Sequence, residues 1–424
     1  MRRAWIAMFA ADTGETLGMN KTVQQAQAYT AGRAAAAAAV STGVPFFRPD
    51  IGEEEIEAIV DTLRSGWLTT GPKTQAFEEA FACAVGAKHA IAVNSCTAAL
   101  HLALDALSLK PGDEVVTSTL TFTATGATII HAGGTPVLAD CDPETLNLDP
   151  ADVLRKITPR TRAIVPVHYA GHPAPMDEVL EIARQHRLTV VEDAAHALPA
   201  SYRGRRIGTI GDLTAFSFYA TKNLTTGEGG MLTTADEALA ERLQTRRLHG
   251  MSRNAWRRYS TSGTWRYDVS YPGFKYNMTD MAAAMGLVQL RRLPALHRRR
   301  HQIAALYTEL LADVPQLQLP VSRPEVEHAW HLYVVRMRPE QLRIHRDEVI
   351  EELKAAGVAT SVHFIPLHLH SYYSERFGYR PEDFPIASAA ADTILSLPLF
   401  TLMCDDEVRY VAATLRRILD ANRR

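Results

Sequence analysis

The sequence predicts an α/β fold, with a large domain built on a mostly parallel sheet and a smaller C-terminal α+β domain. Between residues 90 and 233, short apolar runs alternate with helical stretches. This alternation is typical of a parallel sheet covered by helices on both faces. Beyond about Leu290 the pattern of apolar residues changes and helical spacing dominates. The chain has 424 residues, which is long for a single hydrophobic core.

Three segments follow from this reading: an N-terminal extension over 1–43, a large domain over 44–290 and a small domain over 291–424. The extension opens with two arginines and a short apolar stretch, and acidic residues follow too soon for a good signal peptide. The alanine tract over 34–39 specifies no packing partner. We therefore expect the extension to be weakly ordered.

The elements of the large domain follow from hydrophobic spacing. Two helices open it, because their apolar residues recur at helical intervals. These residues are Ile56, Ile59, Val60 and Leu63 in the first helix, and Phe77, Phe81 and Val85 in the second. The expected strands are 90–93, 114–118, 135–139, 163–167, 188–191, 214–218 and 231–233. The expected helices among them are 97–107, 124–130 and 176–186.

The small domain is expected to begin with a long helix that leads out of the basic run 297–301 and ends at Leu311. We interpret that run as a solvated helix face or a subunit contact rather than a nucleic-acid patch. A strand over 332–336 and helices over 346–356 and 407–421 follow.

Composition excludes several classes of protein. The formal net charge of -2 gives no basic excess for binding nucleic acid. The four cysteines form no C-x-x-C pair, so neither a zinc site nor a disulfide framework is indicated and a reducing cytoplasm fits. No apolar run reaches the roughly 20 residues that a membrane-spanning helix needs. We expect no metal, no membrane and no nucleic acid.

The strongest chemical signal is a carboxylate and an amine that each follow a predicted strand. Asp193 ends the strand in Val190–Asp193, and Lys222 comes shortly after the strand over 214–218. Ligands of open α/β sheets bind where strands end, so both groups should reach one crevice. A lysine that condenses with an aldehyde and an aspartate that pairs with a pyridine nitrogen suit pyridoxal 5′-phosphate (PLP). Taken alone, each residue has an ordinary alternative, a structural aspartate and a solvated lysine.

A phosphate group needs a cradle, and residues 94–100 lie where a strand turns into a helix. The helix start offers free backbone N–H groups, together with the hydroxyls of Ser95 and Thr97. The alternative is that one hydroxyl merely caps the helix. Ser217 is a second hydroxyl candidate. Phe122 follows a strand and is placed to stack on a flat ring, although such a residue is more often part of the core.

Several longer stretches carry a resemblance to a known family. They are 65–72, 94–104, 166–171, 192–197, 216–223, 227–230, 249–250, 273–280, 329–332 and 395–400. With these matches in this order, the chain from Val44 onward resembles the DegT/DnrJ/EryC1/StrS family of PLP-dependent sugar aminotransferases. The resemblance implies the fold of type I PLP enzymes, which is the fold of aspartate aminotransferase.

The resemblance also assigns roles to the residues around the ring. Lys222 would carry the cofactor as a Schiff base, and Asp193 would pair with the pyridine nitrogen. His196 would lie near the phenolic oxygen, and Phe122 would stack on the ring.

The resemblance also implies which residues bind the phosphate of the cofactor and which border the substrate. Cys96 and Thr97, with Ser95 and Ser217, would hold the phosphate. Asn277 would reach the phosphate from a neighbouring subunit, which implies a homodimer with shared active sites. The residues expected to border the sugar are Trp67, Leu68, Thr69, His331 and His363.

Two positions bear on how far the resemblance holds. The phosphate turn of the family usually carries glycine where this chain has Cys96. A backbone N–H contact survives that change, whereas a backbone conformation that requires glycine would not. Lys222 is retained, whereas related dehydratases carry histidine there, and this favours transamination.

The implied reaction moves an amino group from an amino acid, expected to be glutamate, to a keto sugar through pyridoxamine 5′-phosphate. The expected acceptor is a UDP- or dTDP-linked 4-keto-6-deoxy sugar, in amino-sugar biosynthesis for cell-surface polysaccharide or a secondary metabolite. Alternatives within the family are 3-keto sugars and cyclitols. A non-catalytic PLP-binding regulator is the alternative of another class. A nicotinamide oxidoreductase would need a G-x-G-x-x-G turn, and residues 94–100 contain no glycine.

Overall fold

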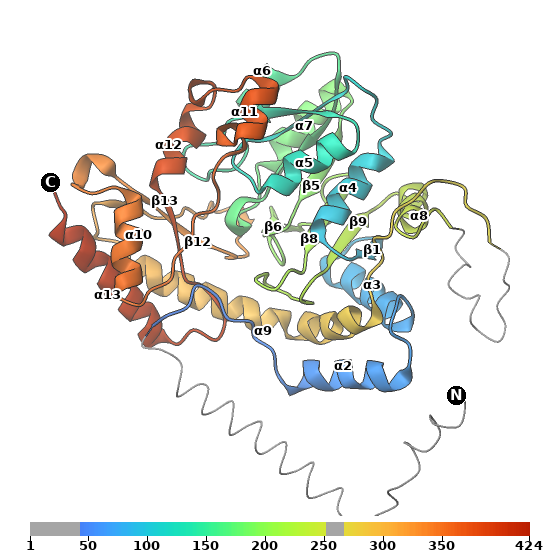
Figure 1. Cartoon of the computed structure of the whole chain (residues 1–424), viewed down its shortest axis with the longest axis horizontal. Coiled ribbons are helices and arrows are strands. Elements are labelled where there is room, and N and C mark those ends of the chain that lie inside the picture. The colour runs from blue at the N-terminus through green and yellow to red at the C-terminus, as the bar shows by residue number, and fades with distance from the viewer. Residues whose placement is uncertain (1–42, 252–266) are drawn as a thin grey trace, which may run out of the picture. The chain divides into compact units, whose positions relative to one another are not determined.

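The computed structural model describes residues 43–251 and 267–424. Residues Val44–Arg424 belong to one compact unit (Figure 1). The predicted N-terminal extension, apart from Gly43, lies outside the described residues. Along the described parts of the chain, no helix is both long enough and apolar enough to cross a bilayer. The same parts contain no cluster of three or more metal-ligating side chains.

The described residues form a central seven-stranded sheet with the order β1-β9-β8-β5-β4-β2-β3. Its strands are β1 (His89–Val93), β2 (Glu114–Ser118), β3 (Thr135–Ala139), β4 (Thr161–Val165), β5 (Thr189–Asp193), β8 (Leu213–Ser217) and β9 (Gly230–Thr234). β9 is antiparallel to both of its neighbours, β1 and β8. The remaining pairs are parallel. The prediction of a mostly parallel sheet is therefore confirmed.

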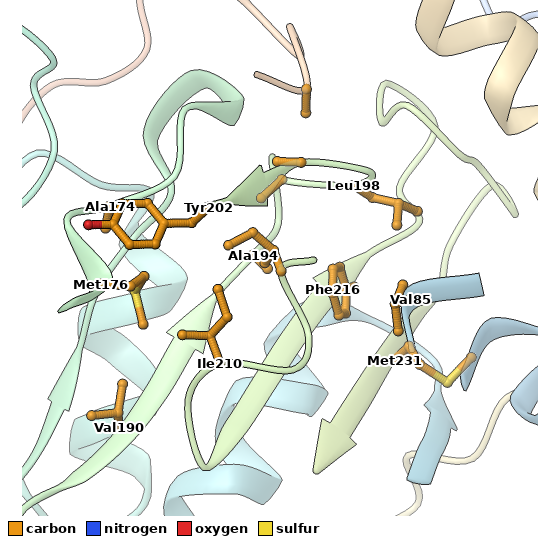
Figure 2. Close-up of a cluster of buried hydrophobic side chains, with 14 of the residues drawn as sticks. Val85, Ala174, Met176, Val190, Ala194, Leu198, Tyr202, Ile210, Phe216 and Met231 are labelled. Atoms are coloured by element: carbon orange, nitrogen blue, oxygen red, sulfur yellow. The ribbon is translucent and has the colours of Figure 1, made fainter. Parts of the chain in front are cut away.

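Helices cover both faces of this sheet, as Figure 1 shows. They are α3 (Pro72–Val85), α4 (Cys96–Ala106), α5 (Thr123–His131), α6 (Pro150–Lys156), α7 (Met176–His186) and α8 (Glu237–Arg246). Successive strand residues point to opposite faces. In β1, Ile91 and Val93 therefore pack in one core with α4 and α8, and Ala90 and Ala92 pack in another with α3 and α7. Figure 2 shows the second core, where Val85 and Met231 lie beside Phe216.

A long helix, α9 (Asp280–Leu311), joins the large sheet to the C-terminal part of the chain. Thr279 caps it, because its side chain accepts from the backbone N–H of Ala282. The helix starts well before the predicted beginning near residue 297 and continues through Pro294. Since α9 runs without a break across residue 290, the division into 44–290 and 291–424 stays a prediction.

A third hydrophobic core, apart from the two that flank the large sheet, surrounds the C-terminal half of α9. A small antiparallel sheet with the order β10-β12-β13 packs there with two helices. These elements are β10 (Leu317–Gln318), β12 (Tyr333–Met337), β13 (Ile394–Leu397), α10 (Arg346–Ala355) and α13 (Asp405–Ala421). Tyr307, Tyr333 and Phe400 are fully buried among them. This arrangement agrees with the α+β architecture predicted for the C-terminal part.

Several details differ from the sequence-based expectations. β4 ends at Val165 instead of residue 167, because Pro166 follows and has no N–H to donate. The basic run is not simply a solvated face, since His297 and Arg300 are buried. Short elements were not anticipated: β6 (Ser201–Tyr202), β7 (Arg205–Arg206), β11 (Val326–Glu327), α11 (Ser371–Phe377) and α12 (Pro385–Thr393). The first predicted helix corresponds to α2 (Glu53–Ser65).

Candidate active site

Four strands of the large sheet end at one edge and deliver the predicted site residues there. β2, β5 and β8 share one direction, and β1 has the same direction because both β1 and β8 are antiparallel to β9. A cleft of about 310 Å³ opens at this edge. Its lining includes the predicted residues Ser95, Cys96, Thr97, Phe122, Asp193, His196, Ser217, Lys222, His331 and His363.

A second set of predicted residues lies elsewhere in the chain. Trp67, Leu68, Thr69 and Asn277 do not line this cleft. They gather around Thr70. The Thr70 hydroxyl accepts a hydrogen bond from the Asn277 side chain at 2.6 Å, and the Thr70 backbone carbonyl accepts one from the Trp67 indole at 3.2 Å. The segment 67–69 and Asn277 thus form one patch outside the cleft, and their roles at the sugar and at the phosphate stay predictions.

Asp193 ends β5 with its carboxylate in the cleft. One carboxylate oxygen accepts from Thr125 Oγ1 at 2.7 Å, and the other accepts from the backbone N–H of Ala195 at 3.1 Å. Burial nevertheless raises the pKa of Asp193, because these two bonds and the nearby Lys222 do not fully offset the loss of water. A proton donor in the cleft, such as a pyridine N–H, would complete the stabilisation of this carboxylate.

Lys222 follows β8 and faces the same cleft. The residue is half-buried, and burial lowers the pKa of its amine from 10.5 to about 8, against the opposing influence of Cys96 and Asp193. A neutral amine is the nucleophilic form of lysine. The cleft therefore makes Lys222 a usable nucleophile near neutral pH.

The lowered pKa predicts a pH profile for cofactor uptake by the apoprotein. Below pH 8 the neutral fraction of Lys222 falls about tenfold per pH unit, so the rate of PLP uptake should rise with pH and level off above about 8. Stopped-flow absorbance measures this rate. Pyridoxine 5′-phosphate lacks the aldehyde, and its uptake corrects for titration of the ligand itself. A midpoint that remains near 10.5, the ordinary value for lysine, would contradict the assignment.

The N-terminus of α4 forms a cradle for an anion. Ser95 caps the helix, because its Oγ accepts from the backbone N–H of Ala98 at 3.1 Å. Within the described residues, nothing accepts from the backbone N–H groups of Cys96 and Thr97. Unpaired N–H groups and the helix dipole together bind phosphate well. Ser95 is therefore a cap, and the helix start remains free for a ligand, so its role as a phosphate cradle stays a prediction.

Gly230 is what allows this turn to lie so close to the sheet. A Cβ at this position would lie 2.6 Å from Ser95 C and O and 2.8 Å from Cys96 N. We expect Gly230→Ala to push the cradle out of place and to weaken PLP binding roughly tenfold or more, since overpacking costs about 1–3 kcal/mol. Fluorescence titration of the apoprotein measures the dissociation constant. Gly52→Ala serves as control, because a Cβ there would meet only the ends of the Glu55 and Arg292 side chains, at 3.4 Å and 3.9 Å. Equal affinities for wild type and Gly230→Ala would contradict the expectation.

Aromatic side chains form the remaining wall of the cleft. The His196 ring lies 4.4 Å from that of His331 and 5.7 Å from that of Phe364. Phe122, which is 57% exposed, lies 5.7 Å from Phe364. Burial lowers the pKa of His196, His331 and His363, and that of His363 falls to about 4. The wall thus offers neutral imidazoles and an exposed ring face.

These features fit PLP. The α4 cradle suits the phosphate, Phe122 presents a face for a flat ring, Asp193 lacks a full complement of donors, and Lys222 holds a reactive amine. Sequence reasoning missed Thr125, Phe364 and Asn223, whose contacts arise only in the folded chain. The position of Asn223 directly after Lys222 was the one available signal.

Comparisons with known proteins agree with this geometry. The model of the DegT/DnrJ/EryC1/StrS aminotransferase family matches residues 49–416. The chain is 53% identical over 377 residues to the spore coat polysaccharide biosynthesis protein SpsC of Bacillus subtilis, covering 89% of this chain and 97% of SpsC. It is 52% identical over 380 residues to an uncharacterized protein of Methanocaldococcus jannaschii, MJ1066, covering 90% and 98%.

A solved structure is similar over nearly the same length. The Streptococcus pneumoniae protein Spr1654, assigned as a sugar aminotransferase, superimposes with a TM-score of 0.84 at 36% identity. The match covers 89% of this chain and 99% of Spr1654, whose structure is known in its PLP and PMP forms. With a family model that spans most of its length and such relatives, this chain belongs to the DegT/DnrJ/EryC1/StrS aminotransferase family.

Proposed function

We propose that this PLP-dependent sugar aminotransferase acts on a nucleotide-linked 4-keto-6-deoxy sugar and takes its amino group from glutamate. The observation that carries the proposal is the meeting of Lys222 and Asp193 in one cleft whose other wall consists of neutral histidines. The role of SpsC in polysaccharide biosynthesis supports a sugar as the acceptor.

The residues that would hold PLP follow from the geometry of the cleft. Lys222 would bond to its aldehyde, Asp193 would pair with its ring nitrogen, and Phe122 would stack on its ring face, since all three line the cleft. The start of α4 at Cys96 and Thr97, with the hydroxyl of Ser217, would hold its phosphate. Bound PLP supplies an electron sink and carries the amino group between the two substrates.

The chain's own groups provide proton transfer and orientation. The Nζ of Lys222, with its pKa near 8, both accepts and gives a proton close to neutral pH. His196 has a buried Nδ1 that forms no hydrogen bond with any described group. This nitrogen is therefore available to an oxygen at the ring, in the position expected for the phenolic group. The hydrogen bonds from Thr125 and Ala195 hold the carboxylate of Asp193 in a fixed orientation.

We further propose a homodimer whose active sites are shared. The patch of Trp67, Leu68, Thr69 and Asn277 would then contribute to the cleft of the neighbouring subunit, with Asn277 at the phosphate. Analytical ultracentrifugation tests the oligomeric state. In addition, Asn277→Ala subunits mixed with Lys222→Ala subunits should regain activity, because half of the mixed dimers' sites would be intact. We place the enzyme in the cytoplasm.

Two alternative functions would each give a different result in the assay described below. A 3-keto sugar or a cyclitol is an alternative acceptor in the same family. A PLP-binding regulator without turnover is the alternative of another class, and the reactive Lys222 speaks against it.

The deciding experiment is an amino-transfer assay with purified protein, glutamate and a panel of UDP- and dTDP-linked 4-keto and 3-keto sugars. We expect 2-oxoglutarate to form beyond about one equivalent per active site only with a 4-keto sugar, and NMR of the product to place the new amine at C4. An amine at C3 would select the first alternative. No half-reaction with any of several amino acids would select the regulator.

A further inference from the structure

The side chain of Asn223, next to Lys222 in the chain, has one possible orientation. Its Nδ2 lies 2.9 Å from the carbonyl oxygen of Leu198 and 2.8 Å from that of Ala329. Carbonyl oxygens only accept hydrogen bonds, so the NH₂ group of the amide must face them. The amide oxygen of Asn223 therefore points to the Nδ1 of His331, at 3.2 Å.

This orientation determines which nitrogen of His331 carries the hydrogen. An amide oxygen only accepts, so Nδ1 of His331 must donate. Burial, with His196 and Lys222 nearby, lowers the pKa of His331 far below its usual range, and the ring is neutral. A neutral ring with hydrogen on Nδ1 has a lone pair on Nε2. Among the described groups none bonds to that Nε2, and His331 lines the cleft.

The backbone at His331 is fixed as firmly as its side chain. Its N–H donates to the Ala170 carbonyl at 3.1 Å, and its carbonyl accepts from the buried Arg300 guanidinium at 3.3 Å. Arg300 also donates to the carbonyl of Trp330 at 3.1 Å. The ring itself lies 4.4 Å from the ring of His196. Nε2 of His331 is therefore a preorganised hydrogen-bond acceptor in the cleft.

We propose that Asn223 is a positioning residue that keeps His331 in its Nδ1–H form, and that Nε2 of His331 accepts a hydrogen bond from a hydroxyl of the keto sugar. The second part rests on the proposed function. A lone pair suits an O–H donor and repels the carboxylates of glutamate, and the amino nitrogen of glutamate is the atom that reacts. His331 therefore serves the half-reaction with the sugar and not the half-reaction with the amino acid.

Two variants of His331 separate the acceptor from simple packing. Asparagine keeps a donor toward Asn223 but has no atom at the Nε2 position, whereas glutamine places its amide near that position. In single-turnover assays, His331→Asn should leave the glutamate half-reaction within about threefold of wild type. It should raise the KM for the keto sugar nucleotide about 10- to 100-fold, as expected for an unpaired buried group. His331→Gln should recover much of this loss. Equal slowing of both half-reactions, or no effect of asparagine on the sugar, would overturn the proposal.

The tautomer can be measured directly in the wild-type holoenzyme, without sugar. Long-range ¹H–¹⁵N correlation of histidine rings should show His331 with hydrogen on Nδ1, assigned by the loss of its signals in His331→Asn. In Asn223→Ala this preference should weaken, and the sugar KM should rise without further loss in the double variant with His331→Asn. Hydrogen on Nε2 in the wild type would overturn the role of Asn223. This measurement stays decisive even if the sugar panel yields no turnover, in which case the proposed function alone fails.

Discussion

Replacing Lys222 by alanine should abolish amino transfer. The variant loses both the amine that bonds to PLP and the group that moves the proton, and the proton-transfer role alone is worth about 10²- to 10⁴-fold. The steady-state assay with glutamate and the accepted keto sugar measures the loss, and the absorbance band of covalently held PLP should vanish as well.

Lys110→Ala is a matched control for this variant, because Lys110 is exposed and lies outside the cleft. It should retain wild-type activity. Circular dichroism of both variants should show the wild-type fold. Turnover that persists in Lys222→Ala would contradict the catalytic assignment.

Glu192→Ala should cause the largest loss of stability among the variants considered. Glu192 and His168 are both fully buried, and His168 Nε2 lies 2.9 Å from one oxygen of Glu192. The other oxygen accepts from the backbone N–H of Gly211 at 2.7 Å and from the Thr214 hydroxyl at 2.8 Å. Alanine would leave all three donors buried and unpaired. The free energy of unfolding should fall by about 3–5 kcal/mol.

Urea denaturation of the holoenzyme measures that change. Glu181→Gln removes a carboxylate from the exposed surface of α7 and should leave the midpoint unchanged. Because Asp193 follows Glu192 directly on β5, PLP affinity should fall in parallel with stability. An unfolding midpoint of Glu192→Ala equal to that of the wild type would contradict the role assigned to this network.

The pairing of Lys222 with Asp193 could be predicted because it depends only on strand order and on where parallel strands end. Arg300 shows the opposite case. In the sequence it belongs to a run of cations that resembles a solvated face, yet its guanidinium is buried against the carbonyls of Trp330, His331 and Leu399. No local pattern reveals carbonyl partners that come from distant segments.

The boundaries of helices and the close contacts between distant segments could not be predicted from the sequence either. The basic run suggested that a helix begins near residue 297, but α9 starts at Asp280 because packing against α2 and α3 stabilises its first turns. Gly230 looked like part of a glycine-rich loop, and only the structure shows its Cα against the backbone of Ser95 and Cys96. The hydrogen bond from His331 to Asn223 also joins residues far apart in the chain.

Lys222 should bond covalently to PLP in the cleft that it shares with Asp193. Borohydride reduction of the holoenzyme fixes that bond, and mass spectrometry of a proteolytic digest then locates it. We expect the added mass of the reduced cofactor on the peptide that contains Lys222. The same mass on any other lysine, with Lys222 unmodified, would contradict it.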